Sequence, residues 1–191
     1  MTYISLVDQA HEFLAGVIQP GDAVIDATVG NGYDTLFLAE AVGDTGKVLA
    51  FDIQEQAIEN TLSILKQKNL QHRVSLLLQS HASVEDHIST AMRNRIKAVM
   101  FNLGYLPGSD KSVTTRGQST LIALNAVLPH MASGGSISVV AYRGHSGGEE
   151  ETQAVLNWSS HLDTAFFTVY VTKPTASSEK SPCLIMISKH L

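Results

Sequence analysis

The chain has 191 residues, of which 44% are hydrophobic and 16% are charged, and its formal net charge at pH 7 is −5. This composition is ordinary for a globular protein and excludes extensive disorder, and the length predicts a single domain over residues 1–191. No apolar run approaches the roughly 20 residues that span a bilayer, and no basic signal-peptide segment is apparent, so no membrane contact is expected. The single cysteine, Cys183, excludes an internal disulfide and predicts a buried thiol in a protein of the reducing cytoplasm.

The net negative charge does not favour nucleic-acid binding, but the acidic excess is confined to one half of the chain. Residues 1–104 contain seven Lys or Arg against twelve Asp or Glu, whereas residues 105–191 contain six of each. A local basic surface can therefore exist in the second half.

The first half of the chain alternates between helical and strand-like patterns. Apolar positions at helical spacing predict helices over residues 5–18, 33–42 and 54–68. Short apolar runs predict strands over residues 23–27, 47–52 and 74–78.

The second half continues this alternation and then departs from it. Helices are predicted over residues 84–92, 118–131 and 149–160, and strands over residues 98–102, 135–142, 165–172 and 184–188. The last two strands are joined without a helix, which predicts an antiparallel hairpin.

Strands that alternate with helices imply an α/β fold with a mostly parallel sheet and helices on both of its faces. Five such units followed by a hairpin resemble the Rossmann-like, seven-stranded sheet of class I methyltransferases. In open sheets of this kind, ligands bind beyond the carboxyl ends of the strands. The residues that follow each strand are therefore the candidates for function.

The turn after the first strand reads Asp26-Ala-Thr-Val-Gly-Asn-Gly-Tyr-Asp34. Its two glycines, Gly30 and Gly32, allow positive φ and a close approach of a ligand to the backbone. Twenty residues after Gly32, Asp52 ends the second strand, where a carboxylate can accept both hydroxyls of a ribose. These residues predict a ligand of the adenosine type.

Two residues favour S-adenosylmethionine over a nicotinamide dinucleotide as that ligand. Thr35 stands where the third glycine of Gly-x-Gly-x-x-Gly would be, and that glycine serves close approach beside a pyrophosphate. Asp26 fits a ligand with an ammonium group and repels a phosphate. The alternative roles of Asp26 and Asp34 are to cap the turn and to start the helix, and a nicotinamide-dependent oxidoreductase remains the alternative of a different class.

Further candidates for cofactor contacts follow the second, third and fourth strands. Gln54 either reaches a ribose hydroxyl or starts its helix, and His81 either stacks on adenine or is an exposed loop residue. The complete set of candidate cofactor residues is Asp26, Thr28, Gly30, Asn31, Gly32, Asp34, Asp52, Gln54, His81, Asn102 and Gly104.

The segment after the fourth strand, Asn102-Leu-Gly-Tyr105, resembles the Asn-Pro-Pro-Tyr loop of enzymes that methylate amino nitrogens. An amine needs its lone pair aligned with the S–CH3 bond, and the Asn102 amide oxygen with the Leu103 carbonyl can accept its N–H bonds. Tyr105 can stack on a planar substrate. The alternative for this segment is a tight turn without a chemical role.

The segment after the fifth strand supplies the remaining candidates. His145 is predicted to accept a proton, so Asn102 and His145 are the candidate catalytic residues. The other histidines are interpreted as surface residues, and no cysteine cluster or paired-histidine spacing predicts a metal site. The candidate substrate contacts are Leu103, Tyr105, Lys111, Arg116, Tyr142, Arg143 and His145.

These segments together resemble the MnmM (YtqB-like) family of class I methyltransferases, formerly labelled rRNA methylases. The matching stretches are residues 26–35, 50–54, 101–111 and 144–150, with Thr115, Ser119 and Thr120. The resemblance implies S-adenosylmethionine-dependent methylation of 5-aminomethyl-2-thiouridine at the wobble position of tRNA, in the anticodon region, by a homodimer. Residues 171–182 depart from the family pattern, which usually has an Asn-Gln pair and a double proline there. A methyltransferase for rRNA or for a small-molecule amine, and a cofactor-binding module without catalysis, remain alternatives.

Overall fold

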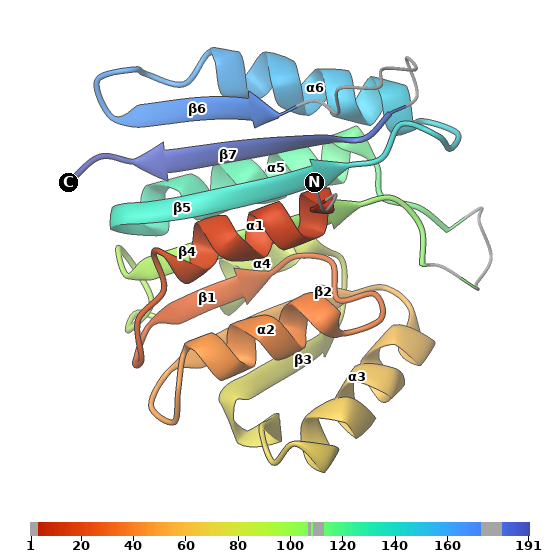
Figure 1. Cartoon of the computed structure of the whole chain (residues 1–191), viewed down its shortest axis with the longest axis vertical. Helices are drawn as coiled ribbons and strands as arrows, with labels where there is room; N and C mark the ends of the chain where they lie inside the picture. The colour runs from red at the N-terminus through yellow and green to blue at the C-terminus, as the bar shows by residue number, and fades with distance from the viewer. Residues whose placement is uncertain (1–3, 107, 109–112, 173–180) are drawn as a thin grey trace.

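The computed structural model describes residues 4–106, 108, 113–172 and 181–191. In this part of the chain, seven strands form one sheet in the order β3-β2-β1-β4-β5-β7-β6. The strands are β1 (Ala23–Asp26), β2 (Lys47–Asp52), β3 (Val74–Leu78), β4 (Ile96–Leu103), β5 (Met131–Ala141), β6 (Phe167–Thr172) and β7 (Cys183–Lys189). Figure 1 shows them as a twisted sheet that runs through the middle of the molecule.

The first five strands are parallel, and β7 runs antiparallel to both β5 and β6. This arrangement confirms the predicted seven-stranded sheet with a closing antiparallel hairpin. The strand order reverses between β1 and β4, and in doubly wound sheets the crevice at such a reversal receives the ligand.

Within the described ranges, α-helices cover both faces of the sheet. One face carries α1 (Leu6–Ala15), α2 (Tyr33–Ala41) and α3 (Glu55–Gln67), and the other carries α4 (Val84–His87), α5 (Gly117–Val127) and α6 (Gly148–Ser160). Neighbouring residues of one strand serve the two faces, as Val24 packs under α1 and α2 while Ile25 joins the core beneath α5. The central strands are therefore apolar along their length, which is the pattern that the sequence displays.

Several predicted elements have different bounds in the structure, including the helix predicted over residues 5–18, which ends at Ala15, and the helix predicted over residues 118–131, which ends at Val127. The helix predicted over residues 84–92 ends at His87, because Ile88 is extended and Asn94 adopts a left-handed conformation. Val84, Ile88 and Met92 are all buried. Their spacing of four residues therefore arises because the segment after α4 is buried, and not because the helix continues through it.

Strand β5 begins four residues earlier than predicted. Met131 pairs with Ile96, and the register then shifts before Ser136 pairs with Ala98. Gly134, at φ +64°, lies in this irregularity, and its small and polar sequence neighbours had indicated a loop.

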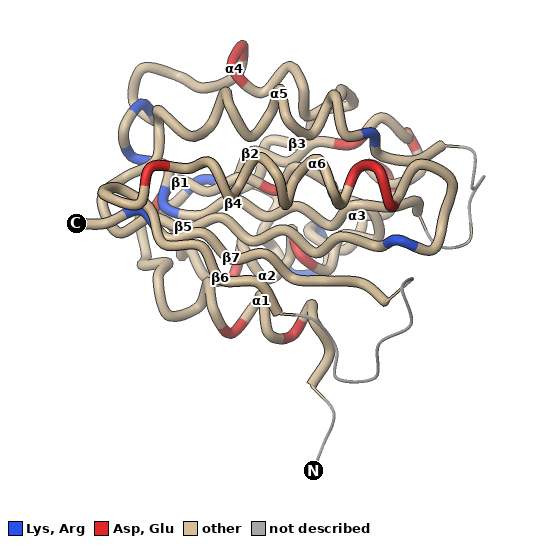
Figure 2. Tube along the Cα trace, turned by 90° about the horizontal axis from the view of Figure 1, so that it is seen from above, with Lys and Arg blue, Asp and Glu red and all other residues tan. Residues whose placement is uncertain are grey.

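No helix in the described ranges is long and apolar enough to cross a membrane. Cys183 is buried in β7, as its apolar neighbours predicted. Lys and Arg positions are scattered along the described trace rather than gathered in one band, and acidic positions mark the start of α6 (Figure 2).

Candidate functional site

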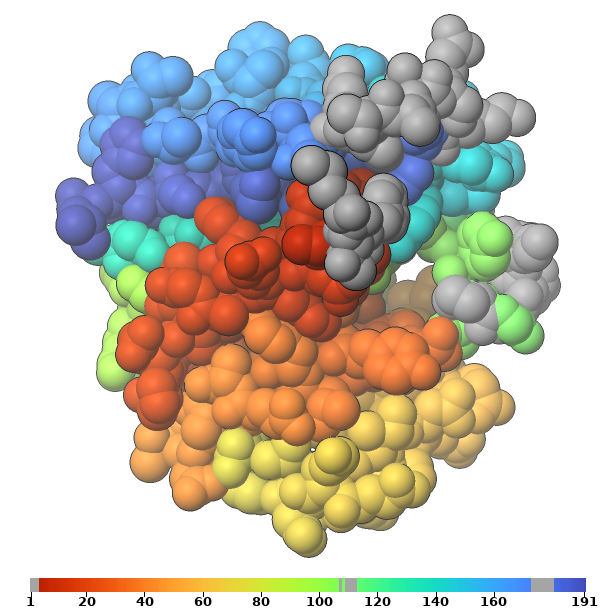
Figure 3. Space-filling view, in the orientation of Figure 1, coloured from red at the N-terminus to blue at the C-terminus, as the bar shows by residue number. Residues whose placement is uncertain are grey.

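The carboxyl ends of strands β1 to β5 border a cavity of about 600 Å3. Figure 3 shows the molecule hollowed between the orange segments of its first half and the green segment that follows β4. This volume falls within the roughly 300–1,000 Å3 of small-molecule sites, and the cavity lies at the switch point of the sheet.

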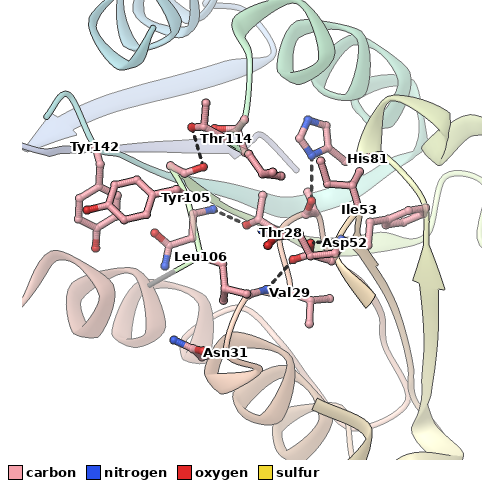
Figure 4. Close-up of a pocket in the computed structure, with 18 of the residues that line it drawn as sticks. Thr28, Val29, Asn31, Asp52, Ile53, His81, Tyr105, Leu106, Thr114 and Tyr142 are labelled. Atoms are coloured by element: carbon pink, nitrogen blue, oxygen red, sulfur yellow. Dashed lines mark hydrogen bonds between the residues drawn. The ribbon is translucent and has the colours of Figure 1, made fainter. Parts of the chain in front are cut away.

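Most of the residues predicted as site residues line this cavity. Those that do are Thr28, Gly30, Asn31, Asp34, Asp52, Gln54, His81, Asn102, Gly104, Tyr105, Tyr142, Arg143 and His145. In Figure 4, Ile53 and His81 lie at one end of the cavity near Asp52, and Tyr105 and Tyr142 lie at the other. We call the first, with Asp52, Ile53 and His81, the Asp52 end, and the second, with Tyr105, Tyr142 and His145, the tyrosine end.

The carboxylate of Asp52 is held in place by two backbone N–H groups. Gly30 donates to its Oδ2 at 2.9 Å, and Gln54 donates to its Oδ1 at 2.9 Å. Gly30 reaches this position with φ +54°, which favours glycine. Each carboxylate oxygen keeps a further lone pair, so Asp52 can accept two hydroxyls from a ligand in the cavity.

Asp26 does not line the cavity, which corrects its prediction as a direct ligand contact. The side chain is fully buried beneath the turn, where Oδ1 accepts from the Thr28 N–H and Oδ2 accepts from the Thr35 hydroxyl. Burial, together with the nearby charge of Asp34, raises the pKa of Asp26 from its ordinary 3.8 to about 7. Asp26 therefore organises the turn, as the capping alternative predicts.

Gly32 is also absent from the cavity wall, and the space beside it is occupied by a helix. A Cβ at this position would lie 2.5 Å from the Thr61 Oγ1 of α3, and the residue has φ +82°. The prediction that Gly32 contacts the cofactor is corrected accordingly. The space left by the absent side chain is filled by Thr61 rather than by a ligand.

His81 is buried at the Asp52 end and is not the exposed loop residue of the alternative interpretation. Its ring lies edge-on to Phe101, and its Nδ1 donates to the Ala27 carbonyl at 3.0 Å. Burial lowers the pKa of His81, so the ring is neutral near neutral pH. The bond to Ala27 ties the turn after β3 to the turn after β1 (Figure 4).

Asn102, at the end of β4, is bonded to the turn after β1 through both backbone and side chain. Its N–H donates to the Thr28 Oγ1 at 2.7 Å, and its Nδ2 donates to the Asp34 Oδ2 at 3.3 Å. A carboxylate can only accept, so the NH2 group of Asn102 faces Asp34. The two turns that the sequence singled out separately thus meet at the cavity.

The backbone carbonyls of the loop after Asn102 accept hydrogen bonds from other segments of the chain. The Gly104 carbonyl accepts from the Thr115 N–H at 2.9 Å and from the Thr114 hydroxyl at 2.9 Å. The Leu103 carbonyl accepts from the Tyr142 N–H at 3.2 Å, and Leu103 is buried outside the cavity wall. Leu103 does not line the cavity, but its carbonyl oxygen keeps a second lone pair beside the bond from Tyr142, so the predicted substrate contact of this carbonyl stays a prediction.

His145 lies between Tyr105 and the first turn of α6. Its Nδ1 approaches the Ser146 carbonyl at 3.1 Å and the Thr114 Oγ1 at 3.2 Å. Because a carbonyl only accepts, Nδ1 carries the hydrogen of the neutral ring and Nε2 keeps a lone pair. Nε2 is buried, with no hydrogen-bond partner in the described part of the chain, and a Cβ on Gly148 would lie 2.8 Å from it.

Tyr142 packs beside Gly104 at the tyrosine end. A Cβ on Gly104 would lie 3.7 Å from the Tyr142 ring. Burial and the charge of Asp34 raise the pKa of the Tyr142 phenol above its ordinary value of 10, so it stays neutral near pH 7.

The basic residues predicted to contact a substrate are placed differently from one another. Arg143 lines the cavity, and its Nε lies 3.1 Å from the Glu149 carboxylate. Arg116 is exposed at the start of α5 and does not line the cavity. Lys111 lies outside the described residues, as do Lys173 and Lys180, two further lysines that the sequence offers for phosphate contacts.

The structure adds residues that the predicted set lacked. Half of these wall residues are apolar, and they include Val7, Ala27, Val29, Phe51, Ile53 and Leu106. Val7 comes from α1, so the first helix contributes to the cavity. Apolar side chains are not recognisable as ligand contacts from sequence alone. Only a position next to a strand end could have indicated those outside α1.

Glu151 is a further missed residue, buried behind the cavity wall in α6. Its Oε2 accepts from the Thr115 hydroxyl at 2.6 Å and its Oε1 accepts from the Thr120 hydroxyl at 2.7 Å. Burial raises the pKa of Glu151, and the two hydroxyls oppose that rise. From the sequence, Glu149 to Glu151 favour a helix start, with fixing a cationic amine or His145 as the alternative role. Helix α6 begins at Gly148, as the first role predicts.

Among the described residues, no group of three or more His, Cys, Asp or Glu side chains is placed to hold a metal ion.

Comparison with known proteins finds a matching family and similar relatives. The family model described as "Putative rRNA methylase" matches residues 48–188. A chloroplastic tRNA (mnm(5)s(2)U34)-methyltransferase of Arabidopsis thaliana is 43% identical over 161 residues, which cover 80% of this chain. The chain spans 58% of the length of that curated relative.

Two solved structures are similar along nearly all of their length. A "putative rRNA-methylase" of Clostridium thermocellum superposes with a TM-score of 0.92 at 40% identity, covering 99% of this chain and 100% of that one. A "putative methyltransferase" of Streptococcus mutans in complex with SAH superposes with a TM-score of 0.87 at 37% identity, covering 98% of this chain and 99% of that one.

Proposed function

This chain belongs to the family described as "Putative rRNA methylase", and from that premise we propose that it is an S-adenosylmethionine-dependent N-methyltransferase acting on tRNA. Its substrate is 5-aminomethyl-2-thiouridine at the wobble position, which becomes 5-methylaminomethyl-2-thiouridine. The printed activity of the Arabidopsis relative and the SAH bound in the Streptococcus mutans structure support this assignment. SAH is the product that S-adenosylmethionine leaves after it gives up its methyl group.

One observation carries the proposal: Asp52 and Asn102 line the same cavity. The Asp52 carboxylate, suited to a ribose, and the Asn102 amide, suited to an amine, therefore lie in one site. The bond from the Asn102 N–H to Thr28 fixes the distance between the end of β4 and the turn after β1, which is itself bonded to Asp52 through Gly30. A fixed distance of this kind is what an in-line transfer requires of its two reactants.

The residues at the Asp52 end fit S-adenosylmethionine. The Asp52 oxygens would accept the ribose hydroxyls, and Ile53 and His81 in the same part of the cavity would flank the adenine. Gly30 and Asn31 also line the cavity and would contact the methionine portion. When bound, the cofactor supplies an electrophilic methyl group on a sulfonium sulfur.

Asn102 orients the acceptor amine. With its NH2 group turned to Asp34, its Oδ1 is free to accept an N–H bond of the substrate. A bound S-adenosylmethionine would supply the methyl group to the nitrogen lone pair that Asn102 orients, and the S–C electron pair would go to sulfur. Tyr105 and Tyr142 pack against the pyrimidine ring at the tyrosine end.

The acceptor must lose a proton, because an alkylammonium has a pKa of about 10 on the lysine scale. His145 takes that proton on Nε2 after a shift of its ring, because Nε2 is buried beside Gly148. Its Nδ1 hydrogen is held by the Ser146 carbonyl, which leaves Nε2 as the basic atom. Glu151 supports the charged ring, since the two groups interact electrostatically across the start of α6.

Contacts to the tRNA backbone fall to the rim of the tyrosine end. Arg116 is exposed there and Lys111 precedes it in the same loop sequence, so both are proposed to contact phosphates. Arg143 is tied to Glu149 and is proposed to act in the cavity wall.

The assembly and location of the protein extend this proposal. We propose that residues 1–191 form one methyltransferase domain that acts as a homodimer in the cytoplasm. The family resemblance supports the dimer, and the single buried cysteine is compatible with a reducing compartment. Light scattering of the purified protein measures its mass in solution, and a monomer would contradict the dimer.

The test of function is incubation of the purified protein with S-adenosylmethionine and RNA from a strain that lacks its gene. Nucleoside mass spectrometry then follows 5-aminomethyl-2-thiouridine and its methylated product in tRNA, with rRNA in a parallel reaction. We expect conversion in tRNA alone. A methylated nucleoside in rRNA alone would replace the tRNA assignment, and no methylation together with binding of NADH would replace the enzyme class.

A further inference from the structure

His11 makes a close polar contact with the candidate site from outside the cavity wall. It lies on α1, and its Nε2 is 2.7 Å from the Asp34 Oδ1 of α2. Its ring stacks on Phe37 with centroids 4.2 Å apart and planes at 8°. From the sequence, His11 is predicted to be a surface residue, but only 24% of its side chain is exposed, and contacts with Asp34 and Phe37 fix its position.

Asp34 connects His11 to Asn102. While Oδ1 is bonded to His11, Oδ2 accepts from the Asn102 Nδ2 across a separation of 68 residues. Only 7% of the Asp34 side chain is exposed, so water offers little replacement for either bond. A continuous chain of hydrogen bonds therefore runs from α1 through α2 to the end of β4.

The orientation of the Asn102 amide depends on this chain. An amide can turn by 180° and present either its oxygen or its NH2 group to the cavity. A fixed carboxylate selects the orientation in which the NH2 group faces Asp34 and the oxygen faces the substrate. If His11 is lost, the buried Oδ1 lacks its donor, so Asp34 is free to rotate and Asn102 loses its fixed partner.

We propose that His11 is a positioning residue for methyl transfer, which acts by holding Asp34 so that Asn102 presents its amide oxygen to the acceptor amine. The inference rests on the proposed function, because it assigns a task to the amide of Asn102. It also makes α1 part of the working site, although α1 and Asp34 both precede residues 48–188 that match the family model.

The test compares three variants of the complete chain. His11→Phe keeps the ring that stacks on Phe37 but removes the donor, His11→Gln restores an N–H near the position of Nε2, and Glu12→Gln changes an exposed neighbour on the same helix. With tRNA and S-adenosylmethionine both saturating, we expect His11→Phe to lower kcat about tenfold, because a misaligned amine reacts slowly. His11→Gln is expected to recover most of kcat, and Glu12→Gln to behave as the wild type.

Two further measurements separate positioning from a general loss of structure. The Kd for SAH of His11→Phe is expected to match that of the wild type, and its thermal midpoint to fall by only a few degrees, because the buried Asp34 Oδ1 loses its donor. An unchanged kcat in His11→Phe would overturn the proposal. A parallel loss of SAH affinity and thermal midpoint, without recovery in His11→Gln, would also overturn it, since α1 would then serve only stability.

The side-chain amide resonances of Asn102 test the same chain without any substrate. These resonances are assigned by comparison with Asn102→Ala, and we expect them to shift in His11→Phe and to return in His11→Gln. Unchanged resonances would overturn the proposal. If the wild type methylates no tRNA, the proposed function fails, and these resonances alone decide whether His11 positions Asn102.

Discussion

The Asp52 end of the cavity is held by bonds to backbone groups of the strand turns, whereas Asn102 and the tyrosine end are held by bonds between side chains of different segments. Asp52 is bonded to Gln54, two residues away, and to Gly30 in the neighbouring turn. At the other end, Thr114 meets His145 across 31 residues, and the amide of Asn102 is bonded to Asp34 across 68. The first arrangement suits the binding of an invariant cofactor. The second places the candidate catalytic and substrate-contact residues on loops whose sequences can change independently of the cofactor site.

Replacing Asp52 tests whether the Asp52 end serves cofactor binding alone. Asp52→Ala is expected to weaken the Kd for SAH about 100-fold, because the ribose hydroxyls and two backbone N–H groups lose their acceptor. Isothermal titration calorimetry with SAH measures this change. An unchanged Kd would remove Asp52 from the site and end the comparison.

Replacing Asn102 tests the opposite end with the opposite signature. Asn102→Ala is expected to lower kcat roughly 30-fold through loss of alignment of the amine, while the Kd for SAH stays at its wild-type value. Single-turnover methylation of tRNA with SAH titrations on the same preparation measures both. If the Kd for SAH and kcat fell together, the two ends would not be separable.

The difference between these two kinds of bond explains which parts of the site the sequence could predict. Asp52, Gly30 and Gln54 follow from strand ends and glycine spacing, which are local. His11 and Glu151 carry no local signal, because their roles exist only once α1 meets α2 and α6 meets the loop at Thr115.

The fold was more predictable than the site for the same reason. Each strand and each long helix has its own apolar period, and the alternation sets the order of the layers. The wrong bounds have two causes. At Ile88, buried residues at helical spacing predict a helix where the chain forms a turn, and at Gly134, a glycine interrupts the apolar pattern of a strand. Asp26 and Gly32 were placed correctly in the turn but given the wrong neighbours, since spacing does not tell whether a residue faces a ligand or a helix.

Replacing His145 tests how far the tyrosine end contributes a proton acceptor. His145→Gln is expected to lower kcat about tenfold, since general-base assistance is lost while water remains available. The SAH affinity is expected to be unaffected, because the ring lies at the tyrosine end. Methylation rates measured over a range of pH check this, and a rate equal to that of the wild type at every pH would leave proton removal to solvent.

Replacing Asp26 gives the smallest effect on ligand binding and tests whether the buried acid of the turn is structural. Asp26→Asn keeps an acceptor for the Thr28 N–H and a partner for the Thr35 hydroxyl, and the side chain does not line the cavity. The Kd for SAH is therefore expected to stay unchanged. A large loss of SAH affinity would restore Asp26 to direct contact with the ligand.

The same substitution has a clear effect on stability as a function of pH. The folded-state pKa of Asp26 is raised to about 7 from an ordinary 3.8, so between these values the folded protein holds a proton that the unfolded chain releases. The contribution of Asp26 to stability is therefore present at low pH and is lost as pH rises through 7, with a slope of at most about 1.4 kcal/mol per pH unit. An asparagine side chain does not titrate, so we expect Asp26→Asn to gain stability relative to the wild type as the pH rises from about 5 to about 8. Urea unfolding of both proteins at these two values measures the difference, and a gap that stayed constant or narrowed would mean that Asp26 is ionised in the fold and available to a cation.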